Sequence, residues 1–419
     1  MKTGFREGGA LRLRIVGSLT ALMLIAAACG GDGDGGGGGG GGGLDEDLVV
    51  GALVTLTGEF GSWGEDHATN FEIAADDINA SGVVNVELVV DDESPTAEGA
   101  VRAATKMVEV DGVQAIVGPS SIAMVALEPV ATRNEVPIIS PAAGTVRLDT
   151  VGGEWLFRTY PSDSAEGAAM ATYAIDEGFE RVSILALNEE SPQGIVKVFT
   201  ERYEAAGGEI AARVDFDSGQ PSYQAQVNEA LRTDPDMLYL AAGEESGTTI
   251  IREIRQAGFE GTMGVNGDLT SPGFLKDVGA DLMQGACGGQ ATPDESTPMF
   301  EEYAAKYQEA ANEETYVTMP NAYDALVVIA LAAVAGDDVS GSTIQENLRD
   351  VAGPPGVEVT SFEEGVEALQ DGEDIDYTGP SGLIDFDETG TSPLPFSIYC
   401  VDQGEWGQVT TYQPEELES

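Results

Sequence analysis

Residues 115–145 read AIVGPSSIAMVALEPVATRNEVPIISPAAGT, and this stretch decides the fold. Two short apolar runs, Ala115–Val117 and Val136–Ile139, flank an amphipathic segment from Ile122 to Arg133, a pattern that predicts strand, helix and strand. A right-handed β-α-β unit places the ends of its two strands side by side at one edge of a parallel sheet. Open α/β sheets bind small ligands at that edge. The sequence therefore predicts a small-molecule cleft lined by the residues that follow the two strands, 118–121 and 140–145.

The alternation of strand and helix continues on both sides of this stretch. Strands are expected at Leu48–Leu56 and Val83–Val90, each followed by a helix, and a second series of strands and helices runs from Ser162 to Asp268. The repetition predicts an α/β protein with two Rossmann-like lobes, each built on a parallel sheet. Further elements follow the second series, so we expect the chain to cross back and form a hinge of several strands. The predicted N-terminal lobe is 48–160 and 288–396, and the predicted C-terminal lobe is 161–287 and 397–419.

The first 28 residues have the features of a secretory signal. Basic residues precede an almost unbroken apolar run, Ile15–Ala28. A good membrane-spanning helix needs about 20 apolar residues, so this run is short for one. The run ends in LIAAAC, which resembles the lipobox of bacterial lipoproteins and implies that Cys29 is lipidated. Simple cleavage after Ala28, with Cys29 unmodified, is the alternative.

Residues 29–47 are expected to form a glycine-rich tether. Gly35–Gly43 is an unbroken tract of glycines, which cannot bury a core and behaves as a flexible linker. The expected location is the extracellular face of the cytoplasmic membrane, or the periplasm, with the lipid as the sole membrane attachment.

The composition excludes several partners. Asp and Glu number 73 against 19 Lys and Arg, for a formal net charge of −54. Nucleic-acid binding needs a basic face, and anionic lipid would repel this surface. Such acidity resembles that of proteins from saline habitats, but a solvated surface that keeps an exported protein soluble explains it equally well.

The sequence offers little support for catalysis. It contains no Walker loop and no Gly-x-Gly-x-x-Gly fingerprint after a strand. A serine–histidine–acid triad would depend on the single histidine, His67, which is expected to face solvent from a helix. Cys287 and Cys400 are expected to form a disulfide outside the cytoplasm, with two buried thiols as the alternative. We therefore expect no enzyme, no cofactor and no metal.

The order of the segments resembles a known family over nearly all of residues 48–410: the type I periplasmic binding proteins, in particular the extracellular receptors of branched-chain amino-acid ABC importers. The resemblance rests on the following stretches: GALVTLTGEFGSWGEDHATNFEIAADDINASGVV, VELVVDDESPTAEGAVRAATKMVEVDGVQAIVGPSS, PIISPAAGT, FRTYPSDSAEGAAMATY, YDAL and YTGPSGLIDFDETG. It implies a two-lobed clamp that closes on an amino acid or a related small carboxylate or amide and delivers it to a membrane permease. A sensory receptor of the same fold, coupled to a signalling partner, is the alternative.

The resemblance also implies roles for residues of the cleft. Trp63 matches an aromatic residue that covers the ligand side chain, with a packing role at the surface or in the core as the alternative. Ser120 and Ser121 match the groups that hold a ligand carboxylate, and a helix N-cap would explain them as well. The carbonyl of Ala142 matches the acceptor of the ligand ammonium. The candidate site includes the neighbours of these residues in the same loop, Ser140, Ala143, Gly144 and Thr145.

Other positions depart from the pattern of the resembling family. Gly144 stands where amino-acid binders usually have Thr, with Thr145 next to it, and Ser191 stands where an aromatic residue is expected. Asn266 stands where an acid is expected, with Asp268 two residues on. These departures weaken the case for leucine, isoleucine or valine as the ligand.

A second expected aromatic position is Gly243, which is followed by Glu244. The additional carboxylates Glu189, Glu190, Glu244 and Asp268 would favour a cationic or polyhydroxyl solute. For the first three, we expect instead that they belong to the general acidic surface.

Overall fold

The computed structural model describes residues 43–44, 46–57, 61–293, 295–311 and 320–417. The signal sequence, Cys29 and most of the expected tether lie outside these residues, so their predictions stay predictions. The residues from 42 onward belong to one compact unit. Its two main sheets consist mostly of parallel strands covered by helices, and the prediction of an α/β fold with two lobes is confirmed.

The sheet of the first lobe has five parallel strands in the order β2-β1-β3-β4-β5. The strands are β1 (Leu48–Val54), β2 (Val86–Asp92), β3 (Ala115–Val117), β4 (Ile138–Ser140) and β5 (Leu156–Arg158). Helices cover both faces of a parallel sheet, which explains why β1 lacks polar side chains and why the short strands β3 and β4 are buried along their whole length. The carboxyl ends of β3 and β4 lie next to each other, as the opening stretch predicts.

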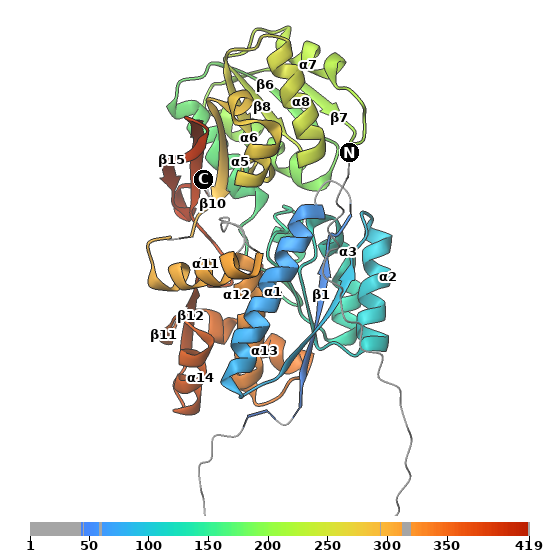
Figure 1. The fold of residues 1–419 in the computed structure, drawn as a ribbon, viewed down its shortest axis with the longest axis vertical. Coiled ribbons are helices and arrows are strands. Elements are labelled where there is room, and N and C mark those ends of the chain that lie inside the picture. The colour runs from blue at the N-terminus through green and yellow to red at the C-terminus, as the bar shows by residue number, and fades with distance from the viewer. Residues whose placement is uncertain (1–42, 45, 58–60, 294, 312–319, 418–419) are drawn as a thin grey trace, which may run out of the picture. The chain divides into compact units, whose positions relative to one another are not determined.

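Two groups of helices pack on this sheet (Figure 1). One face carries α1 (Gly61–Ser81), α11 (Pro298–Ala311), α12 (Pro320–Gly336), α13 (Gly341–Ala352) and α14 (Phe362–Gln370). The other face carries α2 (Ala97–Lys106), which continues as a π-helical turn (Met107–Asp111), and α3 (Ser121–Asn134). A small sheet of β11 (Val357–Val359), β12 (Ile375–Gly379) and β13 (Gly382–Leu383) lies beside the first group. The return of α11–α14 to the first lobe agrees with a chain that crosses back.

The most apolar helix, α12, belongs to the core of the first lobe. Its residues from Pro320 to Ala333 are all buried. No single helix in the described part of the chain is long and apolar enough to cross a membrane. Within the same residues, α12 and α13 have sufficient length and apolar composition only when they are taken together, and they are bent by 105° relative to each other.

The sheet of the second lobe has seven strands in the order β15-β14-β10-β9-β8-β6-β7. The strands are β6 (Arg181–Leu187), β7 (Glu209–Phe216), β8 (Met237–Ala241), β9 (Thr262–Val265), β10 (Ala286–Ala291), β14 (Phe396–Asp402) and β15 (Glu405–Tyr412). The first five pair in parallel, whereas β14 and β15 add antiparallel pairs at one side. The expected lobe boundary after residue 287 is therefore wrong, because β10 pairs with β9 and β14 and lies wholly in this sheet.

Helices also cover both faces of the second sheet. One face carries α5 (Asp163–Asp176), α6 (Glu190–Ala205) and the short α15 (Pro414–Leu417). The other carries α7 (Gln224–Leu231), α8 (Glu244–Gln256), α9 (Pro272–Val278) and α10 (Ala280–Met283). A 3-10 turn, η2 (Gly267–Leu269), follows β9 and begins at the carboxyl edge of the sheet.

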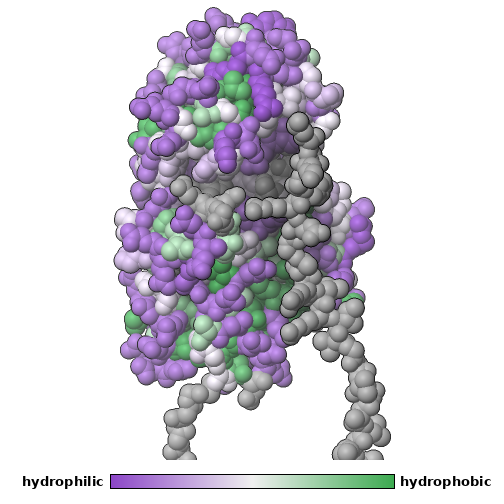
Figure 2. Space-filling view, viewed as in Figure 1, coloured by the Kyte–Doolittle hydropathy of each residue, from purple (hydrophilic) through white to green (hydrophobic). Residues whose placement is uncertain are grey.

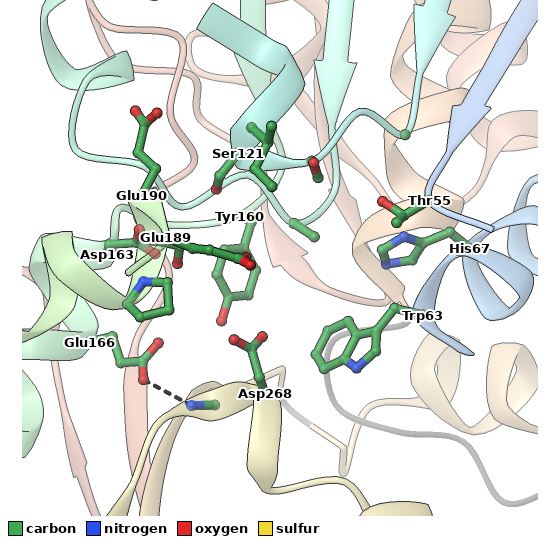
Figure 3. Close-up of a pocket in the computed structure, with 18 residues that line it drawn as sticks. Thr55, Trp63, His67, Ser121, Tyr160, Asp163, Glu166, Glu189, Glu190 and Asp268 are labelled. Atoms are coloured by element: carbon green, nitrogen blue, oxygen red, sulfur yellow. Dashed lines mark hydrogen bonds between the residues drawn. The ribbon is translucent and has the colours of Figure 1, made fainter. Parts of the chain in front are cut away.

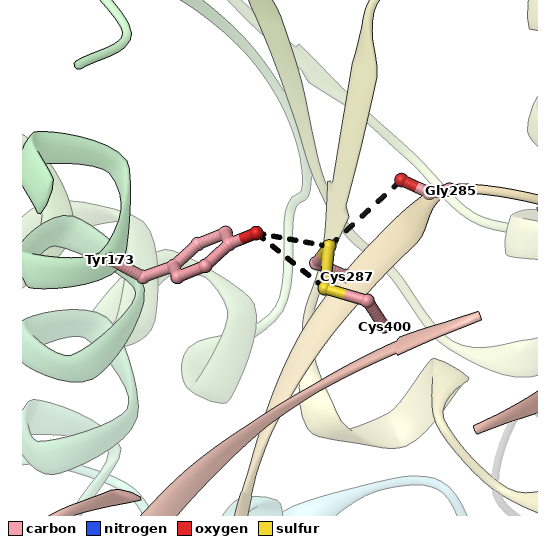
Figure 4. The surroundings of a disulfide bond; sticks show 4 residues. All are labelled: Tyr173, Gly285, Cys287 and Cys400. Atoms are coloured by element: carbon pink, nitrogen blue, oxygen red, sulfur yellow. Dashed lines mark hydrogen bonds between the residues drawn. A yellow bond between two sulfur atoms is a disulfide. The ribbon is translucent and has the colours of Figure 1, made fainter. Parts of the chain in front are cut away.

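A disulfide joins the two strands that the sequence analysis singled out for their cysteines. Cys287 of β10 and Cys400 of β14 lie directly opposite each other in the antiparallel ladder and are bonded. The hydroxyl of Tyr173 lies 3.3 Å from the sulfur of Cys287 and 3.5 Å from that of Cys400 (Figure 4). The bond therefore ties the last part of the chain to the parallel core of the second lobe.

The chain passes between the lobes at three places: after β5, after β10 and before β14. Backbone hydrogen bonds join these crossings, since Arg158 N donates to Gly390 O and Ser392 N donates to Arg158 O. Thr292 N likewise donates to Pro395 O at 2.9 Å. The connection is a hinge of several strands, as expected.

Local differences from the prediction have simple causes. The sequence pattern predicts a strand at Gly382–Phe386, but β13 is limited to Gly382–Leu383, because the backbone turns at Asp385, where φ is +24°. The apolar spacing predicts a helix from Glu65, but α1 begins earlier, at Gly61, so that Trp63 lies on the helix. The strand β15 was not predicted, since polar residues interrupt its apolar pattern.

Asp324 connects α12 to the small sheet and gives a test of the fold. Its side chain is fully buried and accepts hydrogen bonds from the Tyr377 hydroxyl, at 2.7 Å, and from the backbone and hydroxyl of Ser381. Burial raises the pKa of Asp324 to about 7, against the opposing effect of these hydrogen bonds. We expect Asp324→Ala to lower the free energy of unfolding by roughly 3 kcal/mol, since it leaves buried donors unpaired. Urea unfolding monitored by circular dichroism measures the change.

Asp338 provides the matched control. It is exposed and accepts hydrogen bonds from Ser340 and Thr343 near the start of α13, where water can take its place, so Asp338→Ala should cost much less than Asp324→Ala. Equal losses for the two variants would contradict the structural role of Asp324.

Candidate functional site

A pocket that is partly open to solvent lies where the carboxyl edges of the two main sheets meet (Figure 3). The first lobe lines it with Thr55, Trp63, Gly64, His67, Gly118, Ser120, Ser121, Ile122 and Ala142. The second lobe lines it with Asp163, Glu166, Glu189, Glu190, Ser191, Pro192, Gly267 and Asp268, and Tyr160 comes from the crossing after β5. The pocket is therefore built from the strand ends that the sequence analysis singled out, together with acids of the second lobe.

The end of β1 and the first turns of α1 form one wall. Gly64 lets the helix approach the strand end, because a Cβ there would lie 1.8 Å from the carbonyl oxygen of Thr55. Trp63 and His67 lie one turn apart on α1, with their rings 6.2 Å apart and edge to face. His67 is only 4% exposed, so the expectation that it faces solvent is wrong. Burial lowers the pKa of His67 to about 4, which makes its imidazole neutral near pH 7.

The carboxylate of Glu93 binds the residue that precedes α3. Ser120 N donates to Glu93 Oε2 at 2.9 Å, and the Thr55 hydroxyl donates to Glu93 Oε1 at 2.6 Å. Glu93 is buried, which raises its pKa, while its hydrogen bonds to Ser120 and Thr55 act in the opposite direction. The backbone N–H of Ser120 that was expected to hold a ligand carboxylate is therefore engaged within the protein.

Ser140 and the loop after β4 shape the neighbouring wall. The Ser140 hydroxyl donates to the carbonyl of Pro119 at 2.6 Å and accepts hydrogen bonds from the N–H groups of Ala142 and Ala143. Ser140 and Ala143 are fully buried behind the surface of the pocket, whereas Ala142 lines it. Ser140 thus positions Ala142.

Thr145 binds residues of the protein on both of its sides. Its N–H donates to Ser121 Oγ at 3.3 Å, and its hydroxyl donates to Glu190 Oε1 at 2.7 Å. Glu190 also forms an ion pair with Arg147 at 3.3 Å. Thr145 does not line the pocket. Its hydroxyl instead donates a hydrogen bond to Glu190, which is a lining residue.

A buried guanidinium group holds the loop after β4 in place. Arg158 is 1% exposed, and its Nη1 donates to the carbonyl oxygens of residues 143, 144 and 145. Its Nε donates to the Thr391 hydroxyl at 2.8 Å, and its Nη2 forms an ion pair with Asp149. This one side chain therefore connects the pocket loop with the hinge.

The absence of a side chain at Gly144 has a clear physical reason. A Cβ at this position would lie 1.9 Å from Asp163 Oδ1, and Asp163 N donates to Gly144 O at 2.7 Å. Where the resemblance implies a threonine hydroxyl, this chain places the carboxylate of Asp163 instead. Gly144 itself does not line the pocket.

Asp163, Glu166 and Asp268 form a cluster of three carboxylates, which we call the acidic cluster. Burial, and then repulsion within the cluster, raises the pKa of Glu166 well above its usual value, while the Gly267 N–H opposes the shift by donating to Oε1 at 2.8 Å. Burial raises the pKa of Asp163 to about 8, and the attraction of Arg158 opposes this shift. Burial raises the pKa of Asp268 to about 7, and the charge of Glu244 adds to the shift.

Asn266 orients the acidic cluster from outside the pocket. Its Nδ2 donates to Asp268 Oδ2 at 2.7 Å, and its Oδ1 accepts from the Ala242 N–H at 3.0 Å. Glu244 does not line the pocket either; it accepts a hydrogen bond from the Ser271 hydroxyl at 3.3 Å. Both residues act on the pocket through Asp268.

Of the twelve candidate ligand-binding residues, six line the pocket: Trp63, Ser120, Ser121, Ala142, Ser191 and Asp268. The other six lie behind the lining: Ser140, Ala143, Gly144, Thr145, Glu244 and Asn266. Glu189 and Glu190 line the pocket, so assigning them to the general acidic surface was wrong. Five further polar residues of the lining were not predicted from the sequence: Thr55, His67, Tyr160, Asp163 and Glu166. A signal was present for Glu166, which is an acid within the alanine-rich, buried run of α5.

Three polar atoms of the lining residues have no hydrogen-bond partner among the residues that the structure describes: His67 Nε2, Ser120 Oγ and Asp163 Oδ2. Ser120 occupies the N-cap position of α3, yet its side chain makes no capping hydrogen bond. Buried polar atoms are seldom left without a partner in folded proteins. These atoms are therefore suited to contact a ligand.

Comparisons with known proteins give the same picture. The family model described as periplasmic binding protein matches residues 47–370. The chemotactic signal transduction system substrate-binding protein BasB of Halobacterium salinarum is 26% identical, over 85% of this chain and 87% of that protein. Leu/Ile/Val-binding protein homolog 3 of Brucella melitensis is also 26% identical, over 85% of this chain and 92% of that protein.

The solved structures agree in fold. The leucine-binding protein LivK of Thermotoga maritima superposes with a TM-score of 0.77 at 24% identity, over 88% of this chain and 99% of that one. The named relatives are binding proteins rather than enzymes. The family match covers more than half of the chain. This chain therefore belongs to the periplasmic binding protein family, and it resembles the type I members of the branched-chain amino-acid transporter kind.

Proposed function

We propose that this protein is the extracellular receptor of an ABC importer, which captures an amino acid or a related small carboxylate or amide and delivers it to a membrane permease. The observation that carries the proposal is the pocket, which takes its lining from both lobes beside a hinge of three crossings. Ligand that contacts both walls favours the closed arrangement by its differential affinity for it. The closed form is then the species that the permease recognises.

The proposed lobes follow the sheets. The first lobe comprises residues 48–160 and the segment after β10 up to the start of β14, and the second lobe comprises residues 161–291 and 396–417. We also propose that residues 1–28 are removed and that Cys29 carries the lipid that tethers the protein through residues 29–47. Hydrophilic residues dominate the face shown in Figure 2, as suits a protein that is held at a membrane only by its tether.

A second candidate function is ligand sensing. BasB, which is similar over most of this chain, is named as part of a chemotactic signal transduction system. A closed receptor presents a surface that a signalling partner could read in place of a permease. Both functions use the same pocket, so they differ in the partner and not in the chemistry of capture.

The first test is a thermal-shift screen of the purified protein. Its panel contains branched-chain, polar and basic amino acids, amides, polyamines and aromatic acids. A ligand that binds only the folded state at 100 times its Kd adds about 2.7 kcal/mol to stability. We expect at least one compound to raise the melting temperature by a few degrees. No shift with any of them would contradict the receptor proposal.

A pair of variants locates the binding site. Ala142→Leu places a larger side chain in the pocket lining and should weaken the ligand found in the screen by about tenfold or more, because the added atoms take up ligand space. Ala205→Leu, at the exposed end of α6, is the control and should leave affinity unchanged. Isothermal titration measures both. Equal affinities for the two variants would place binding elsewhere.

The anchor is tested separately. In cells that process lipoproteins, the protein should sediment with membranes, whereas Cys29→Ser should appear in the soluble extracellular or periplasmic fraction, because no acyl chain can be attached. A wild-type protein found only in the soluble fraction would indicate simple cleavage after Ala28 instead.

A further inference from the structure

The two walls of the pocket differ in charge. Every acidic side chain in the lining comes from the second lobe: Asp163, Glu166, Glu189, Glu190 and Asp268. The first lobe contributes only side chains that are uncharged near pH 7, including His67 with its lowered pKa. Neither Lys nor Arg occurs among the lining residues that the structure describes. The pocket is therefore an acidic wall that faces a neutral, partly aromatic one.

Acidic side chains of the protein lie at the N-termini of the helices that begin at the pocket. The first residue of α5 is Asp163, and the first residue of α6 is Glu190. At α3, Glu93 accepts the hydrogen bond of the Ser120 N–H. A helix N-terminus attracts an anion through its free N–H groups and its dipole. Because an acidic side chain lies at each of these ends, a ligand carboxylate would meet negative charge there.

Two buried atoms independently point to a ligand in this space. His67 is 4% exposed and Asp163 is 3% exposed, and both line the pocket. His67 Nε2 and Asp163 Oδ2 lack a hydrogen-bond partner among the described residues. They come from opposite lobes, so one ligand between the walls would satisfy both. Figure 3 shows His67 and Trp63 on one side and the acidic cluster on the other.

The wall groups favour an organic cation over a metal ion. In the described part of the chain, no group of three or more His, Cys, Asp and Glu side chains is arranged to hold a metal. Trp63 and Tyr160 line the pocket and offer aromatic surface to hydrocarbon or to a cationic nitrogen. An ammonium or guanidinium group donates hydrogen bonds to several carboxylates at once.

We propose that the ligand of this pocket is a small organic amine or guanidinium cation, whose charged nitrogen lies among Asp163, Glu166 and Asp268 and whose hydrocarbon packs against Trp63 and Tyr160. The inference rests on the proposed receptor function and narrows its ligand class. A free carboxylate on the ligand is not required, because acidic side chains lie at the helix ends where such a group would otherwise be attracted.

Cation binding is coupled to proton release. Charged and polar groups surround each acid of the acidic cluster. Asp163 faces Arg158, Asp149, Asp268 and Ser191, and Glu166 faces Asp268, Asp163, Tyr239 and the Gly267 N–H. Asp268 faces Glu244, Asn266, Glu189 and the other two acids. The raised pKa values keep part of the acidic cluster protonated in the empty pocket near pH 7. A cation favours the ionised forms. Affinity therefore rises with pH between about 6 and 8.5, where the amine itself stays protonated.

The test is isothermal titration of the purified protein, dialysed free of amines, with three probes at one ionic strength. Lysine and norleucine differ chiefly in the terminal ammonium, and putrescine carries two ammonium groups without a carboxylate. We expect lysine or putrescine to bind about tenfold or more tightly than norleucine. We also expect the affinity for the cation to increase from pH 6 to pH 8.5.

Charge-removing variants connect binding to the acidic cluster. Glu166→Gln keeps an oxygen for the Gly267 N–H and should weaken the cation about tenfold or more. The variant should also have a higher melting temperature than the wild type in the absence of ligand at pH 8, because it removes the free-energy cost of burying the Glu166 carboxyl group. This increase would also show that the variant is folded. Glu177→Gln, in the exposed turn after α5, removes the same charge far from the pocket and should change neither property.

The outcomes separate the two proposals. Preferred binding of a cation that depends on Glu166 and on pH supports the inference. Tight binding of norleucine with none of lysine or putrescine overturns the inference and leaves the receptor function standing. Equal affinity of a cation for Glu166→Gln and for the wild type would also overturn the inference. If none of the three probes binds, the cation inference fails, and the thermal-shift screen then decides the receptor function by itself.

Discussion

The site depends on one buried charge, the guanidinium of Arg158. Moving such a group out of water is costly unless its donors are paired, and here they bind three carbonyls of the loop after β4, Thr391 and Asp149. The carbonyls belong to the wall of the first lobe, Thr391 belongs to the hinge, and the nearby Asp163 begins the second lobe. Pairing this charge thus fixes the pocket loop, the hinge and the first acid of the second lobe together.

The same charge helps to explain why the pocket can carry so many carboxylates. Arg158 attracts Asp163, the dipole of α5 favours an acid in its first turn, and the missing side chain at Gly144 leaves room for the carboxylate. Arg147 similarly neutralises part of the charge of Glu190. Glu166 lacks any comparable cation among the causes of its pKa shift, which are burial, two like charges and one opposing N–H. The acidic cluster is therefore only partly compensated within the protein.

Much of the fold follows from the sequence, because buried parallel strands and amphipathic helices leave periodic patterns. The strand ends after Val117 and Ile139 were predicted, as were Trp63 and Ser121 in the pocket. The positions of Asp163 and His67 in the pocket were not predicted, because their roles depend on contacts with other parts of the chain that bury them. His67 is covered through the packing of the α1 N-terminus, and the space of Asp163 is set by a glycine 19 residues earlier. A single sequence does not show which residues contact one another, so it does not distinguish an acid of the pocket, such as Asp163, from the many acids on the surface.

The uneven charge of the two walls bears on how a clamp of this kind works. All acids of the lining come from the second lobe, so the proposed cation would be attracted first to that wall. The first lobe adds aromatic surface, the buried His67 and the hydroxyls of Ser120 and Ser121, which a ligand contacts only when it reaches both walls. Closure is favoured only by interactions that the open form lacks. For the proposed cation, the acidic wall would supply the attraction during capture, and contacts with the neutral wall would favour the closed form over the open one.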